Sequence, residues 1–154
     1  MLKSGRGKQA MKAVILAGGK GTRLAEYTRE IPKPMLKIGG KSILEHQIDL
    51  LIKYNVDDII ILVNYLKDII INQFGDGSTY GVKIRYFEEN KPLGTVGGIK
   101  EVEDWLDEDF LVLLWRCYGE YGPKKTDKFP SKKIVNVHWL SILTIIHTIV
   151  IWLK

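Results

Sequence analysis

Apolar residues gather in short runs along the chain, and each run ends at a glycine-rich or polar segment. Runs rich in β-branched residues and four to eight residues long are typical of buried strands. This pattern predicts three such strands, which are "KAVILA" at 12–17, "DDIIILVN" at 57–64 and "FLVLL" at 110–114. The alternating segment "VKIRYF" at 82–87, which follows the turn-like segment 75–81, predicts a fourth strand.

Helical periodicity separates these strands. Ser42 and Glu45 have the spacing of a capping box, in which each side chain bonds the other residue's backbone N–H. They predict a helix over 41–54, with one apolar face formed by Leu44, Ile48, Leu51 and Ile52. The pattern predicts two further helices, over 65–74 and over 95–106, the second with Ile99, Val102 and Leu106 pointing inward.

Strands that alternate with helices indicate an α/β fold, a mostly parallel sheet with helices on both faces. In such sheets, ligands bind at the carboxyl ends of the strands. The length of 154 residues and a hydrophobic content of 45% suit one domain. Residues 1–10 carry no apolar run, and we expect them to be a disordered extension upstream of Met11.

Charge and cysteine content bear on the expected partners and cellular location of the protein. The net charge of +5 comes from the two flanks, whereas residues 11–114 are mildly acidic and carry no basic stripe. We therefore expect no nucleic-acid partner. The single cysteine, Cys117, excludes an internal disulfide, and the first ten residues lack the apolar region of a secretion signal, so we expect a cytoplasmic protein.

The segment "LAGGKGTRL" at 16–24 follows the first predicted strand. It is not a Walker A loop, because Lys20 is followed by Gly21, and it lacks the third glycine of a dinucleotide-binding loop. Its backbone amides can still cradle phosphate oxygens, and the guanidinium of Arg23 can bind a phosphate with two hydrogen bonds. The alternative interpretation is an ordinary turn with a surface arginine.

Two further motifs point to a family. "IPKPM" at 31–35 holds Lys33 between two prolines, which stiffen the backbone, and "KPLGTVGG" lies at 91–98. With "AVILAGGKGTRL" at 13–24, these motifs resemble the nucleotide-sugar pyrophosphorylases, which are sugar-1-phosphate nucleotidyltransferases. The resemblance covers residues 11–114 and is nearest to mannose- or heptose-1-phosphate guanylyltransferases.

The resemblance implies a Rossmann-like fold and nucleotidyl transfer from an NTP to a sugar 1-phosphate, with GTP favoured and dTTP or CTP as alternatives, and with Mg²⁺ as cofactor. It implies catalytic roles for Arg23 and Lys33, although Lys33 could also be a solvated loop lysine. It implies that the nucleotide is bound by Leu16, Ala17, Gly18, Gly19, Gly21, Thr22, Gly94 and Thr95. Glu88 and Glu89 receive no role, and His46 is expected to be structural.

One expected residue is absent. In the family, the strand that matches 110–114 ends in a glycine followed by a metal-binding aspartate, whereas this chain has Trp115, Arg116 and Cys117. No metal ligand is therefore assigned. Codons for these residues, read one base later, can encode "YGDVM" with the glycine compulsory. We therefore expect that a frameshift after Leu114 has left an incomplete, inactive half-domain, 11–114, followed by a non-family tail, 115–154.

The tail also admits a second interpretation. Residues 134–153 carry no charge, are long enough to span a bilayer and are flanked by lysines. The alternative function is thus a non-catalytic nucleotide-binding module that a C-terminal anchor tethers to a membrane. Zinc binding is not expected, because the spacing of Cys117, His138 and His147 matches no zinc pattern.

Overall fold

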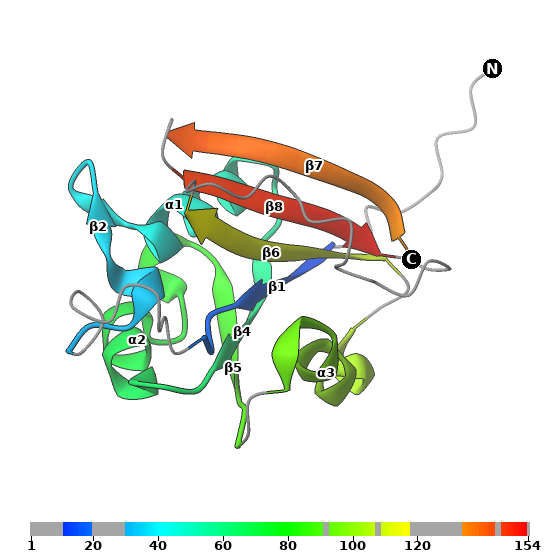
Figure 1. Ribbon diagram of the computed structural model, residues 1–154, viewed down its shortest axis with the longest axis horizontal. Helices are drawn as coiled ribbons and strands as arrows, with labels where there is room; N and C mark the ends of the chain where they lie inside the picture. Colours follow the sequence, from blue (N-terminus) through cyan, green and yellow to red (C-terminus); the bar gives the residue numbers. More distant parts are fainter. Residues whose placement is uncertain are drawn as a thin grey trace.

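The fold is described from a computed structural model of the chain (Figure 1). The structure describes residues 11–19, 30–90, 93–106, 109–117, 134–143 and 146–153, and it describes the side chains of these residues except 95, 96, 115–117, 134–143 and 146–153. In chain order, the elements are β1 (Lys12–Leu16), the 3₁₀ helix η2 (Lys33–Met35), β2 (Lys37–Ile38), β3 (Lys41–Ser42), α1 (Ile43–Lys53), β4 (Asp58–Val63), α2 (Lys67–Phe74), the 3₁₀ helix η3 (Ser78–Tyr80), β5 (Lys83–Glu88), α3 (Gly94–Glu101), the 3₁₀ helix η4 (Glu103–Trp105), β6 (Phe110–Cys117), β7 (Ile134–Leu143) and β8 (Ile146–Leu153).

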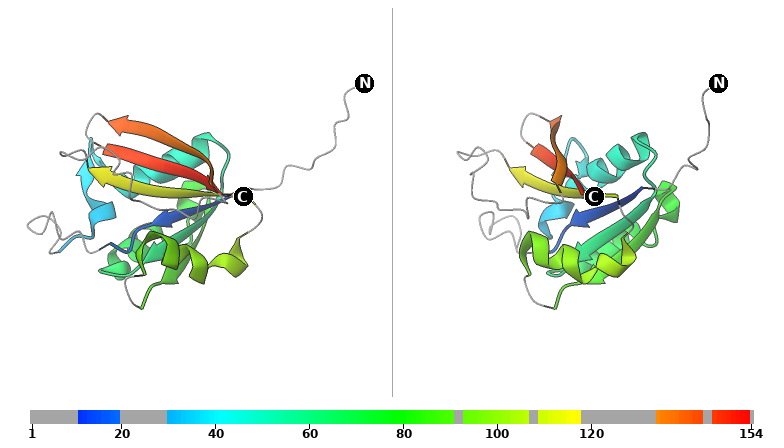
Figure 2. Two further views of the ribbon diagram at one scale, coloured as in Figure 1. Left: turned by 45° about the vertical axis from the view of Figure 1, so that its right-hand side comes forward. Right: turned by 90° about the vertical axis from the view of Figure 1, so that its right-hand side faces the viewer.

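A six-stranded sheet forms the centre of the protein, with the strand order β5-β4-β1-β6-β8-β7 (Figures 1 and 2). The first four strands in this order are parallel to one another, and β8 and β7 extend the sheet in antiparallel fashion. β2 and β3 form a separate small hairpin. The expected α/β architecture with a mostly parallel sheet is therefore confirmed.

Helices cover both faces of the sheet because neighbouring residues of each buried strand point to opposite sides. On one face, Ile15 of β1 and Ile61 of β4 pack in the same cluster as the apolar residues of α1 and α2. On the other face, Val14 and Ile60 pack with Val102 and with partly buried residues of α3 and η4. Strands β1 and β4 are accordingly buried on both sides, which explains their continuous apolar sequences.

The start of α1 confirms the predicted capping box. The Ser42 hydroxyl accepts a hydrogen bond from the Glu45 N–H at 3.1 Å, and the Glu45 carboxylate accepts one from the Ser42 N–H at 2.6 Å. One residue of the predicted apolar face is wrong, because Ile52 is 40% exposed. The buried stripe of α1 instead includes Ile43 and Gln47, so its centre lies further round the helix from Ile52.

Removal of this cap gives a direct test of the helix start. Ser42→Ala is expected to lower the free energy of unfolding by about 1 kcal/mol, because the Glu45 N–H then loses its acceptor in a buried position. Glu45→Gln retains an oxygen that can accept the reciprocal bond, and we expect a smaller loss. Urea denaturation followed by circular dichroism measures both variants. An equal loss of unfolding free energy in both variants would mean that the capping box does not act as described.

Two helix boundaries differ from the prediction. Leu66 adopts a left-handed conformation, with φ of 54°, so α2 begins at Lys67 and not at residue 65. The predicted helix over 95–106 is divided, since α3 ends at Glu101 and the 3₁₀ helix η4 follows. Buried Val102 lies at this junction. Turning the chain here places both Val102 and Trp105 against the sheet.

The last part of the chain extends the sheet. β6 runs three residues beyond its predicted end, to Cys117, so the domain boundary predicted after Leu114 lies inside a strand. Residues 134–143 and 146–153 form β7 and β8, the antiparallel hairpin on β6. No helix in the described parts of the chain is long and apolar enough to cross a membrane. The alternative of a membrane anchor at 134–153 therefore has no support in this structure.

Candidate functional site

The carboxyl ends of β1, β4 and β5 meet at one edge of the sheet, and backbone hydrogen bonds join the residues that follow them. The Ala17 N–H donates to the Leu62 carbonyl at 2.9 Å, and the Glu89 N–H donates to the Val63 carbonyl at 2.9 Å. The Asn64 side-chain amide donates to the Glu89 carbonyl at 2.6 Å. Residues that follow three different strands are thus held side by side, as expected at the ligand-binding edge of a parallel sheet.

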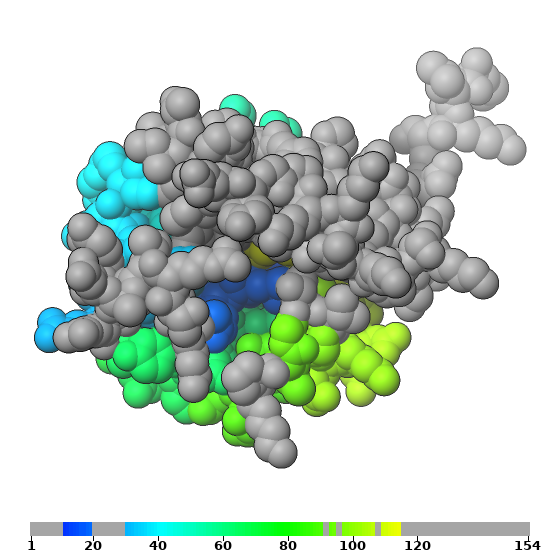
Figure 3. All heavy atoms as spheres, in the orientation of Figure 1, coloured from blue at the N-terminus to red at the C-terminus, as the bar shows by residue number. Residues whose placement is uncertain are grey.

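The first part of the glycine loop leaves the core at this edge. Leu16 is partly buried at the end of β1, Ala17 is 2% exposed, and Gly19 is exposed. Apart from its chain neighbours, none of the described residues has an atom within 4 Å of the position that a Cβ of Gly19 would occupy. Figure 3 shows residues 11–19, in blue, reaching the surface beside the green segments of the chain. The described residues therefore leave the approach to the backbone of Gly19 open.

Glu89 is the functional candidate that the sequence interpretation missed. A Cβ added to Gly18 would lie within 3.0 Å of the Glu89 Oε2, and a Cβ added to Gly98 would lie within 3.0 Å of the Glu89 Oε1. The carboxyl group thus lies between the glycine loop and α3, with one oxygen next to each glycine. The sequence does carry one sign of this position. Glu88 pairs with Val63 at the carboxyl end of β4, so Glu89 directly follows β5 at the edge of the sheet where ligands bind.

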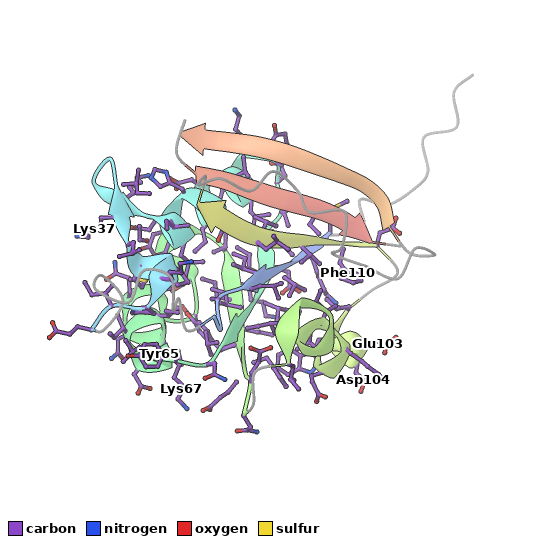
Figure 4. All side chains as sticks on the ribbon, in the orientation of Figure 1. Lys37, Tyr65, Lys67, Glu103, Asp104 and Phe110 are labelled. Atoms are coloured by element: carbon purple, nitrogen blue, oxygen red, sulfur yellow. The ribbon has the colours of Figure 1, made fainter. Side chains whose placement is uncertain are left out.

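The surroundings of Glu89 change its acidity. Partial burial disfavours the charged carboxylate and raises the pKa of Glu89 above its ordinary value. The neighbouring Glu88 points elsewhere, and its carboxylate forms an ion pair with the Lys67 ammonium at 2.5 Å. Figure 4 shows Lys67 near Tyr65, on the same side of the molecule as α2. The two adjacent glutamates therefore have different environments, and only Glu89 lies against the glycine loop.

Gly94 begins α3 in a conformation that favours glycine, with φ of +67°. The backbone of Thr95 lies in the first turn of the same helix. Further along α3, Gly98 is buried, and its missing side chain leaves room for the Glu89 carboxyl group. The motif that contains Gly94 and Thr95 is thus brought to the glycine loop through Gly98 and Glu89.

Lys33 lies in η2, in a stiff segment as the two prolines predict. Pro32 and Pro34 are buried, the Met35 N–H donates to the Pro32 carbonyl at 2.8 Å, and Met35 packs against the core. This segment continues into β2 and β3, which lead to α1. Its backbone therefore has little freedom near Lys33, which is partly buried. The predicted site residues Gly21, Thr22 and Arg23 lie outside the described residues.

The expected Mg²⁺ site does not match the residues present. Mg²⁺ prefers oxygen ligands, above all carboxylates. The last residues of β6 are Trp115, Arg116 and Cys117, none of which has a carboxylate. Within the described ranges, no group of three or more His, Cys, Asp or Glu residues could hold a metal ion. We therefore assign no step of a reaction to a metal bound by this chain.

Charged residues at the opposite end of the sheet have structural partners. Arg85 donates two hydrogen bonds to the Asp58 carboxylate, at 3.0 and 3.2 Å, and its guanidinium lies 5.5 Å from the centre of the Trp105 ring. These contacts join β5, β4 and η4. Figure 4 shows Glu103, Asp104 and Phe110 on the side of the molecule away from Tyr65 and Lys67. The candidate site is thus confined to the carboxyl ends of the strands.

Comparisons with known proteins show which family the chain belongs to. A model of the nucleotidyl transferase family matches residues 12–115. The chain is 40% identical over 104 residues to the UTP--glucose-1-phosphate uridylyltransferase AglF of Haloferax volcanii, and this match covers 68% of this chain and 42% of the relative. It is 37% identical over 126 residues to the mannose-1-phosphate guanyltransferase of Aspergillus oryzae, with 79% of this chain and 35% of the relative covered.

Among solved structures, HddC from Yersinia pseudotuberculosis complexed with GMP-PN superposes with a TM-score of 0.59 at 38% identity, over 66% of this chain and 46% of that one. A putative glucose-1-phosphate thymidylyltransferase from Bacillus anthracis gives a TM-score of 0.63 at 27% identity, over 70% of this chain and 46% of that one. The chain therefore spans less than half the length of these relatives. The glycine loop and the matched residues 12–115 show that this chain belongs to the nucleotidyl transferase family, among relatives that are sugar-1-phosphate nucleotidyltransferases.

Proposed function

We propose that the described site is the nucleotide-binding half of an enzyme that transfers a nucleotidyl group from an NTP to a sugar 1-phosphate. In this reaction a phosphate oxygen of the sugar 1-phosphate bonds to the α-phosphorus of the NTP. The bond from the α-phosphorus to the bridging oxygen breaks, and pyrophosphate leaves with that oxygen. The protein mainly positions two anions and offsets their charge.

The observation that carries this proposal is the meeting of Gly18, Glu89 and Gly98 at the carboxyl ends of the parallel strands. Two motifs that lie far apart in the sequence are in contact there. We assign residues 16–19 to the side of the site that faces the nucleotide, and Gly21, Thr22 and Arg23, next along the chain, to its phosphates. We assign Gly94 and Thr95 to the side of the site that closes over the nucleotide. Lys33 is proposed to stabilise the charge that develops during transfer.

GTP is the proposed nucleotide, with dTTP and CTP as alternatives. Support comes from the relatives named as mannose-1-phosphate guanyltransferases and from the HddC structure with GMP-PN. A uridylyltransferase is among the similar proteins as well, so resemblance alone does not select the base.

We further propose that this chain is an incomplete form of the enzyme, frameshifted after Leu114, in which Mg²⁺ binding and transfer are lost. The support is the absence of a carboxylate at 115–117, where the family has its metal-binding aspartate. A cytoplasmic location is proposed from the single cysteine, Cys117, which suits a reducing compartment.

The roles of Arg23 and Lys33 are best tested in a chain whose reading frame has been restored. Arg23→Ala and Lys33→Ala are each expected to lower kcat/KM for pyrophosphate release at least about tenfold, because each removes a cation that offsets charge in the transition state. Lys37→Ala removes an exposed lysine of β2 near Lys33 and is the matched control, with little expected change. Unchanged turnover in both test variants would contradict the assigned roles.

A further inference from the structure

The two outer strands of the sheet differ in length and in charge. β5 (Lys83–Glu88) lies at one end of the strand order and β7 (Ile134–Leu143) at the other (Figures 1 and 2). β5 has six residues, three of which are charged, whereas β7 has ten residues, with no charged residue and no proline. Charged residues, prolines and short length are features that keep the edge of a sheet from pairing with another chain. β7 has none of these three features.

The backbone of β7 has one side that is paired and one that faces outward. On its inner side β7 pairs with β8, and among the described strands none pairs with its outer side. The pairing with β8 is irregular between Ile134 and Asn136 and between Ser141 and Leu143, and it is regular from Asn136 to Ser141. This central part of β7 therefore presents an uninterrupted row of backbone N–H and C=O groups that can pair with a further strand.

We propose that β7 is a self-association edge, at which two copies of this chain pair β7 with β7 in antiparallel fashion around a twofold axis. A second copy has an edge of the same length and the same hydrogen-bonding pattern, so each edge satisfies the other. An antiparallel partner also continues the existing arrangement, because β6, β8 and β7 already alternate in direction. One continuous sheet then runs through both copies.

The charges next to β7 in the sequence favour this direction of pairing. Lys132 and Lys133 come directly before β7, and the two residues after it carry no charge. In a parallel pair in register, these lysines of the two copies would face one another, and like charges that face one another across two strands repel. In an antiparallel pair they lie at opposite ends of the interface. The charge pattern thus favours a closed dimer over a parallel stack of many copies.

The proposed interface is distant from the candidate nucleotide site in the strand order. The glycine loop follows β1, and two strands, β6 and β8, separate β1 from β7. Glu89 follows β5, at the other end of the order. Self-association is therefore independent of the proposed nucleotidyl transfer, and either proposal can fail without the other.

The first test is the mass of the full chain in solution, measured by light scattering after size-exclusion chromatography at concentrations from about 1 to about 100 µM, the range of a small interface. The mass is expected to rise from that of one chain to that of two and no further. His138→Lys brings two lysines close to the twofold axis and is expected to weaken dimerisation at least about tenfold. Tyr54→Lys adds the same charge at an exposed position after α1 and is the matched control, with no expected change.

Disulfide cross-linking tests the direction of pairing without a change of charge. Each residue from Asn136 to Ser141 is replaced by cysteine, one at a time, in a Cys117→Ser background, and Ile134→Cys is the control at the end of the strand. In an antiparallel pair, a residue at the twofold axis faces the same residue of the other copy, within the distance that a disulfide spans. Cross-linking is therefore expected to be strongest at one central position and absent in Ile134→Cys.

Four results would overturn the proposal. The first is a mass of one chain at every concentration, and the second is a mass that continues to rise beyond two chains. The third is cross-linking of Ile134→Cys as strong as that of the central variants, because it would indicate parallel pairing in register. The fourth is equal weakening by Tyr54→Lys and His138→Lys, because the effect would then follow overall charge and not β7.

Discussion

Gly98→Val is expected to lower the affinity of the chain for GTP about a hundredfold, or about 2.8 kcal/mol. A Cβ at this position would lie 2.9 Å from the Leu62 Cδ1 and within 3.0 Å of the Glu89 Oε1. Leu62 is fully buried in β4 and cannot yield, so the Glu89 carboxyl group must move. The displaced carboxyl group and the added methyl groups then crowd the side of the site that is proposed to face the nucleotide. The free energy of unfolding should fall by about 1–3 kcal/mol as well, because the helix is overpacked.

Calorimetric titration with GTP, at a temperature where circular dichroism shows both proteins folded, separates lost binding from lost folding. Lys100→Val places the same β-branched side chain at an exposed position of α3 and is the matched control. Its GTP affinity is expected to be unchanged. Unaltered affinity in Gly98→Val would mean that the nucleotide does not lie between the glycine loop and α3.

The chain with this sequence is expected to release no detectable pyrophosphate from any NTP and sugar 1-phosphate, whereas a chain with a restored reading frame is expected to do so. The physical reason is the charge of the phosphates. Without a carboxylate at 115–117, the chain lacks the ligand that the family has there for the cation that would offset this charge. A restored Gly-Asp at the end of β6 supplies one, provided that the shifted frame stays open beyond it.

Sequencing of the coding DNA across codons 105 to 154 is the first step, because it shows whether the bases permit the shifted reading. Pyrophosphate release is then measured for the original chain, for the repaired chain and for a repaired chain whose restored aspartate is replaced by asparagine. Activity is expected in the repaired chain alone. Release that depends on sugar 1-phosphate in the original chain, or bases that exclude the Gly-Asp reading, would contradict the frameshift.

The pattern of apolar residues was sufficient to predict the parallel part of the sheet. In β1 and β4 the apolar run and the strand coincide within a residue or two, because burial on both faces makes every position apolar. The capping box located the start of α1 for a similar reason, since Ser42 and Glu45 interact within one helical turn. Interactions between residues that are close in the sequence can be predicted from a single sequence.

Features that depend on contacts between distant segments were not predictable in this way. Ile52 has the helical spacing of a core residue, yet the position of α1 on the sheet leaves it exposed. Glu89 resembles Glu88 in sequence, and only the approach of Gly18 and Gly98 distinguishes the two. The hairpin of β7 and β8 was missed because an uncharged segment suits a strand paired in a sheet as well as a membrane span.

The central place of β1 has a consequence for how the chain folds during synthesis. β1 leaves the ribosome early, but its partners are β4 and β6, and β6 begins only at Phe110. Until then, one edge of β1 has no neighbour, and Val14 lacks the part of its cover that Val112 of β6 provides. Closing such long loops slows folding and gives a high contact order. Nascent chains of this protein should therefore depend on chaperones that hold exposed apolar segments, and a slower supply of the later codons should increase aggregation.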